Sequence, residues 1–165
     1  MRFVTSLNIL YYFKHQFVPV DRILEIYFVG CHNNCKGCHN CQLQDRNFKS
    51  TRIITPTEIL MEVIVYKNIA KQVHILGGEP LEQPTPSIIE FTDLLKSSGF
   101  KNITLFTGSK IEESDITRSN PIFRNVDYVK IGRYDETQLN TKKIKDKYLG
   151  ITLASLNQKV IPLHK

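Results

Sequence analysis

The stretch Ile23-Leu-Glu-Ile-Tyr-Phe-Val-Gly-Cys31-His-Asn-Asn-Cys35-Lys-Gly-Cys38 joins a hydrophobic run to three closely spaced cysteines. The run predicts a buried β-strand that ends at Gly30. Three thiolates on one tight loop can bind three irons of a cubic 4Fe-4S cluster. A cluster that only transfers electrons usually has four thiolate ligands, whereas an open metal position is typical of a catalytic site. The stretch therefore predicts a strand that delivers an iron–sulfur loop with one iron left open.

A second motif, Ile75-Leu-Gly-Gly-Glu-Pro80, follows another short hydrophobic segment. Val73-His-Ile-Leu76 predicts a parallel strand, and Gly77 and Gly78 predict a turn in which the backbone can approach a ligand closely. Ligands of open parallel sheets bind at the carboxyl ends of the strands. We therefore expect the cysteine loop and the glycine turn to meet at one edge of a sheet.

Together, the two motifs resemble those of the radical S-adenosylmethionine superfamily. Within it, the short chain, Lys36-Gly-Cys-His-Asn40, Val129-Lys-Ile-Gly-Arg-Tyr134 and Ala154-Ser-Leu-Asn-Gln-Lys159 resemble the activating enzyme of anaerobic (class III) ribonucleoside-triphosphate reductase. The resemblance covers about residues 20 to 160. It departs from the family pattern at the additional Cys41, at Leu156 and over residues 1–21.

The resemblance implies an enzyme with two cofactors, a 4Fe-4S cluster and S-adenosyl-L-methionine. The open iron would chelate S-adenosylmethionine, whose reductive cleavage gives methionine and a 5'-deoxyadenosyl radical. The radical would abstract hydrogen from a glycine of the large anaerobic reductase. The implied partners are this reductase and an external one-electron donor such as flavodoxin or ferredoxin. Activation of another glycyl-radical enzyme, or modification of a peptide or small molecule, remains an alternative.

Site residues follow from the motifs and from the resemblance. Cys31, Cys35 and Cys38 are the expected cluster ligands, and catalysis would act through them. Gly77 and Gly78 are expected to meet the methionine amino group, with Glu79 either binding or orienting the turn. The resemblance places Gly37 and His39 near the adenine. Thr107 and Lys130 are candidates for ribose or carboxylate contacts because they lie at predicted strand ends.

The rest of the chain alternates between helices and strands. Thr55-Pro-Thr-Glu58 predicts a capped helix that runs to about residue 71, and a second helix begins at Thr85-Pro86 and ends before Gly99. Further strands are expected at 102–107, 128–131 and 159–163, with a weak helix near 111–118. We predict an α/β fold with a mostly parallel sheet, an open partial (β/α) barrel of the radical S-adenosylmethionine type, because 165 residues are too few for a complete barrel. Residues 1–165 would form one domain, in which the role of residues 1–22 is open.

Composition narrows the functional classes. The hydrophobic fraction is 41% and the formal net charge is +6. No run approaches the roughly 20 apolar residues of a membrane span, and the N-terminus lacks a signal-peptide cleavage site, so we expect a cytoplasmic protein. The lysine-rich run 142–147 accompanies no nucleic-acid motif and is better explained as a solvated loop or a docking surface for an acidic partner.

Several residues admit simpler roles. A non-catalytic module with a zinc site of Cys35, Cys38 and Cys41, completed by Cys31, His32 or His39, is the main rival, although it does not account for the glycine turn. If Cys31, Cys35 and Cys38 bind a cluster, Cys41 is a surplus thiol. The remaining isolated side chains are expected to have a structural role or to lie on the protein surface: His15, His74, His164, and the Asn157-Gln158 pair.

Overall fold

The computed structural model describes residues 8–163, which form a seven-stranded sheet with helices on one face. His164 and residues 1–7 of the N-terminal segment lie outside the described residues. The strand order is β3-β1-β2-β4-β5-β6-β7. The strands are β1 (Leu10–Val18), β2 (Ile23–Phe28), β3 (Arg52–Ile54), β4 (Gln72–Gly77), β5 (Ile103–Phe106), β6 (Tyr128–Ile131) and β7 (Lys159–Pro162).

The centre of the sheet is parallel, as the sequence predicts. Strands β2, β4, β5 and β6 pair in parallel, while β1 and β7 pair antiparallel with their neighbours. The predicted strand at 128–131 is confirmed, and the terminal strand is confirmed over Lys159–Pro162. The fold is therefore a mixed α/β structure with a mostly parallel sheet. The strands pair in a linear order from β3 to β7, and these two edge strands do not pair with each other.

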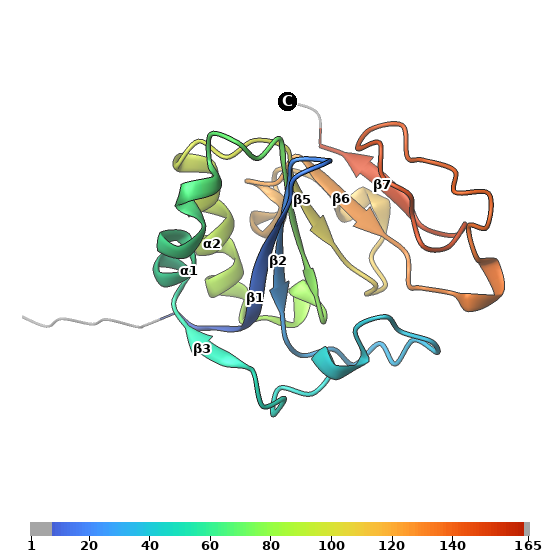
Figure 1. Cartoon of the computed structure of the whole chain (residues 1–165), viewed down its shortest axis with the longest axis horizontal. Coiled ribbons are helices and arrows are strands. Elements are labelled where there is room, and N and C mark those ends of the chain that lie inside the picture. Colours follow the sequence, from blue (N-terminus) through green and yellow to red (C-terminus); the bar gives the residue numbers. More distant parts are fainter. Residues whose placement is uncertain (1–7, 164–165) are drawn as a thin grey trace, which may run out of the picture.

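Two helices cover one face of the sheet. Helix α1 (Pro56–Val63) begins with the predicted capping box of Thr55 and Glu58, and α2 (Thr85–Ser97) ends before Gly99, which has a φ of +96°. Figure 1 shows both helices on the same side of the strands. Successive right-handed crossovers between parallel strands place their connections on one face. Among residues 8–163, the other face of the sheet consequently carries no α-helix.

The core lies between this helical layer and the sheet. Alternate residues of β2, Leu24, Ile26 and Phe28, are fully buried in the same cluster as side chains of both helices. The ring of Phe28 packs edge-on against Phe91 of α2, with centroids 5.7 Å apart. The intervening residues of β2, Glu25 and Tyr27, are only partly buried. Hydrophobic alternation thus assigns one face of β2 to the helices.

Two helix predictions are wrong in extent. The first helix ends at Val63 rather than near Lys71, and a 3-10 turn follows over Ile64–Tyr66. The consecutive β-branched residues Val63, Ile64 and Val65 disfavour continuation of an α-helix. The weak helix near 111–118 is reduced to a 3-10 turn at Glu113–Asp115.

The N-terminal segment has a structural role that the sequence analysis missed. Residues Leu10–Val18 form β1, which pairs antiparallel with β2 and also with β3. Because β1 covers the side of β2 that would otherwise be a sheet edge, the strand that leads to the cysteine loop is paired on both sides.

Candidate iron–sulfur site

The three predicted cluster ligands line one cavity at the carboxyl ends of the parallel strands. Cys31, Cys35 and Cys38 are half-buried there, whereas Cys41 is exposed and lies outside the cavity. In Figure 1 the loop that follows β2 lies beneath the ends of the central strands. The cavity also includes most other residues predicted for the site: His39, Gly77, Gly78, Glu79, Thr107 and Lys130. Gly37 is not among the lining residues.

The glycine turn is bonded directly to the start of the cysteine loop. Gly78 N donates to Phe28 O at 2.9 Å, and Glu79 N donates to Gly30 O at 2.8 Å. Gly30 N in turn donates to Leu43 O at 2.7 Å. The expected meeting of the two motifs is therefore observed, and main-chain hydrogen bonds hold it together.

Both glycines of the turn are needed for this close approach of backbone to backbone. A Cβ on Gly77 would lie 2.4 Å from Phe28 O, and one on Gly78 would lie 2.6 Å from Gly30 O and 2.8 Å from Leu43 O. The sequence analysis explained these glycines by the approach of a cofactor. These main-chain contacts alone are a sufficient reason for glycine at both positions. Substitution of Gly78 is therefore expected to disturb the packing of the backbone.

Glu79 is almost completely buried, with 1% of its surface exposed. Its carboxylate accepts hydrogen bonds from Asn33 Nδ2 at 2.9 Å, Gly108 N at 2.8 Å and Leu81 N at 3.1 Å. These donors belong to the cysteine loop, the end of β5 and the glycine turn itself. Of the two roles considered for Glu79, orientation of the turn is therefore the one for which the structure gives contacts.

Lys130 places an amine at the cavity wall. Burial lowers the pKa of Lys130 to about 8, although the negative charges of Glu79 and Cys35 oppose this effect. Its Nζ donates to Gly132 O at 3.3 Å and lies 5.8 Å from the centroid of the Phe106 ring. Thr107 is buried, and its hydroxyl accepts from Ser109 N at 3.0 Å. Both residues thus lie where the strand-end argument predicts.

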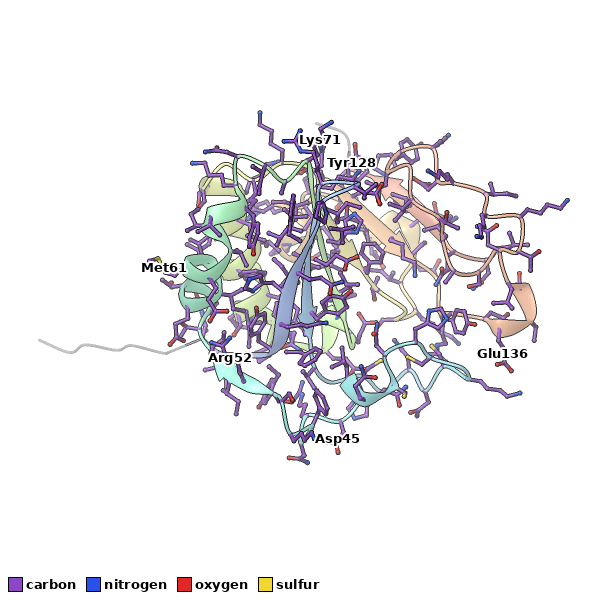
Figure 2. The ribbon with its side chains drawn as sticks, viewed as in Figure 1. Asp45, Arg52, Met61, Lys71, Tyr128 and Glu136 are labelled. Atoms are coloured by element: carbon purple, nitrogen blue, oxygen red, sulfur yellow. The ribbon has the colours of Figure 1, made fainter. Side chains whose placement is uncertain are left out.

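The segment after β6 forms a further part of the cavity wall, through Gly132 and Tyr134. The rings of Tyr134 and His39 are 5.0 Å apart, and Lys36 pairs with Glu136 at 2.7 Å. Glu136, labelled in Figure 2, lies on a 3-10 turn beside the cysteine loop. A Cβ on Gly37, which has a φ of +71°, would lie 2.9 Å from Glu136 Oε2. Gly37 therefore contributes to the packing between the loop and this wall.

The late Asn157-Gln158 pair has the structural role that the sequence favoured. Asn157 Nδ2 donates to Arg133 O at 2.8 Å, and Gln158 Nε2 donates to Gly132 O at 3.2 Å. Gln158 Oε1 also accepts from Ala154 N and Ser155 N. The pair therefore fixes the backbone that follows β6, although Gln158 also lines the cavity.

The cavity residues that sequence reasoning did not select include Asn33, Phe106 and Tyr134. Asn33 lies inside the cysteine motif, and Phe106 directly precedes a predicted site residue. Tyr134 ends a segment that was noted only for its resemblance. Of these three, only Phe106 lies at a predicted strand end; Asn33 and Tyr134 follow their strands by three residues and carried no such signal.

The donor set fits a cluster. Burial raises the pKa of the Cys31 thiol, with Glu79 and Glu82 adding to the rise, while the N–H of Asn33 opposes it. Within residues 8–163, no three His, Cys, Asp or Glu side chains are grouped around a single-ion position. A cubic cluster instead takes each thiolate on a different iron. Cys31, Cys35 and Cys38 line one cavity and can each supply one such thiolate.

The fold and these cysteines together define an iron–sulfur protein. The chain belongs to the 4Fe-4S single cluster domain family, whose model matches residues 22–160. This range contains all three cavity cysteines and the glycine turn, and it begins after β1. A comparison with curated proteins gave no match. In the part of the chain that the structure describes, no helix has the length and apolar character needed to cross a membrane.

Proposed function

We propose that this protein is a radical S-adenosylmethionine enzyme that activates the anaerobic ribonucleoside-triphosphate reductase by generating a glycyl radical on it. The observation that carries the proposal is the joint lining of one cavity by three cluster cysteines and the Gly77-Gly78-Glu79 turn. A three-thiolate site leaves one iron free for a ligand. When bound, the reduced cluster supplies the electron that cleaves S-adenosylmethionine to methionine and a 5'-deoxyadenosyl radical.

The side chains of the cavity support binding of such a ligand. Lys130 provides a cation for a carboxylate, since a pKa of about 8 leaves it largely protonated at neutral pH. The rings of His39 and Tyr134, tilted at 47° to each other, provide an aromatic surface for an adenine. Leu76 and Phe106 contribute apolar walls that limit access of water. The protein's part in the reaction is thus to orient the ligand and shield it from solvent.

The architecture also suits a protein substrate. The linear strand order leaves the sheet open between β3 and β7, which is compatible with an open partial barrel. The described helices cover one face only, so a loop of a partner can approach the cavity from outside. An external one-electron donor, such as flavodoxin or ferredoxin, would reduce the cluster.

The test is anaerobic mixing of the reconstituted protein with S-adenosylmethionine, a strong reductant and the large reductase. We expect a doublet electron paramagnetic resonance signal on the reductase, which disappears when its radical-bearing glycine is changed to alanine. Formation of 5'-deoxyadenosine without a radical on the reductase would retain the cofactor chemistry and refute the activase assignment. A colourless protein that binds one zinc would refute both.

A further inference from the structure

Asn33 is the point at which four segments of the site meet. Its side-chain Nδ2 donates to Glu79 at 2.9 Å, and its Oδ1 accepts from Arg133 Nη2 at 3.3 Å. Its main-chain N–H contacts Cys31 Sγ at 3.5 Å. The partners fix the orientation of the amide, because a carboxylate can only accept and a guanidinium can only donate.

The packing around Asn33 leaves it little freedom. A Cβ on Gly108 would lie 3.0 Å from Asn33 Nδ2, so the end of β5 passes directly beside the amide. Gly108 N also donates to the same carboxylate oxygen of Glu79 that accepts from Asn33. The end of β5 and the Glu79 carboxylate thus both hold the Asn33 side chain. The main-chain N–H of Asn33, which contacts Cys31 Sγ, is held in place with it.

Glu79 brings a buried negative charge to this network. All three hydrogen-bond donors to its carboxylate are neutral amides, and none of the salt bridges among the described residues involves it. Buried carboxylates are costly unless hydrogen bonds satisfy them. Three such hydrogen bonds satisfy Glu79, and they hold its charge in the lining of the cysteine cavity.

We propose that Asn33, held between Glu79 and Arg133, is a positioning residue that sets the reduction potential of the cluster. It does so in two ways: it holds an N–H donor on the Cys31 sulfur, and its amide disperses the charge of the Glu79 carboxylate. Hydrogen bonds to ligand sulfurs and the net charge around a cluster both tune its potential. The inference requires only that the chain binds a cluster, and it is independent of the proposed activase reaction.

The proposal predicts potential shifts of opposite sign for two neighbouring substitutions. Asn33→Ala removes the dispersing amide and frees the N–H, so the midpoint potential should become more negative. Glu79→Gln removes the negative charge while keeping an acceptor for Asn33, so the potential should become more positive. Arg133→Gln removes a positive charge and the second anchor of Asn33, and should shift the potential in the negative direction.

The experiment is an anaerobic redox titration of each reconstituted variant, with iron and sulfide counts for every sample. Asn47→Ala is the matched control, because Asn47 is an exposed asparagine of the same connection that does not line the cavity. It should leave the potential unchanged.

Each possible result bears on the proposal. Opposite shifts for Asn33→Ala and Glu79→Gln at full iron content support it. Equal potentials, or shifts of the same sign, overturn it. If Asn33→Ala does not assemble a cluster, the signs for Glu79→Gln and Arg133→Gln decide instead, and failure of all three to hold iron shows that the network is structural only. None of these readouts needs S-adenosylmethionine or the reductase, so a failed activase assay leaves the result intact.

Discussion

Substitution of Gly78 by alanine should weaken the junction between the glycine turn and the cysteine loop. The added Cβ would lie 2.6 Å from Gly30 O, 2.8 Å from Leu43 O and 2.9 Å from Gly30 N. All three neighbours are main-chain atoms, which cannot rotate away as a flexible side chain can. The backbone must therefore separate at the point where Gly30 accepts from Glu79 and donates to Leu43.

The expected cost follows from overpacking. Insertion of a methyl group into a well-packed region costs about 1–3 kcal/mol, and the three main-chain contacts place this site in the upper part of that range. For a chain of this size each kcal/mol corresponds to a fall of about 2–4 °C in Tm. We therefore expect Gly78→Ala to lower the Tm by about 5–10 °C and to reduce the iron content after reconstitution.

Thermal unfolding followed by circular dichroism, with iron analysis, measures both effects. Gly150→Ala is the matched control, because Gly150 has a φ of +69° but nothing within 4 Å of an added Cβ. It should show only the cost of a left-handed alanine, about 1 kcal/mol, with full iron content. If Gly78→Ala keeps the wild-type Tm and full iron and loses only S-adenosylmethionine binding, steric exclusion of the cofactor rather than backbone packing explains this glycine.

Three further predictions concern the cysteines, a buried histidine and the cavity lysine. Cys31→Ala should abolish the intact cluster and Cys41→Ala should retain it, as judged by iron and sulfide counts; the opposite pattern would replace the predicted ligand set. Burial lowers the pKa of His74 to about 4, so the unfolded chain binds a proton below its own pKa of about 6.5 while the folded chain does not. The contribution of His74 to the free energy of unfolding is therefore fully present at pH 7. The free energy of unfolding should fall by about 2 kcal/mol between pH 7 and pH 5. Urea unfolding at both pH values should show this loss, and His74→Gln should remove it. Because the pKa of Lys130 is about 8, S-adenosylmethionine affinity should decline as the pH rises through 8, and calorimetry with Lys130→Met should show weaker binding without that pH dependence.

Much of the central sheet was accessible to sequence reasoning. Strands β2 and β4 are short hydrophobic runs closed by glycine, and parallel strands covered by helices require such runs. The same logic placed Thr107 and Lys130 at strand ends, where both line the cavity. Local patterns were sufficient here because each strand carries its own stop signal.

The edges of the fold were less predictable. The turn between β1 and β2 contains Arg22 at a φ of +54°, a position where glycine or asparagine would have given a turn signal. Without that signal, Leu10–Val18 could not be recognised as the partner of β2. The role of Asn33 depends on Arg133, which lies one hundred residues later. Such a contact is set by tertiary packing and leaves no periodic trace in the sequence.

The closure of the cysteine loop bears on how the protein matures. Gly30 and Cys31 donate main-chain hydrogen bonds to Leu43 and Gln44, so both stems of the loop are joined before any iron is considered. Because these bonds join protein atoms only, we expect iron to order mainly the segment between the stems, in contrast to small zinc domains, whose folding requires the metal. Removal of iron by a chelator should therefore leave the stems joined, and the same molecule should take up a cluster again when iron and sulfide are restored.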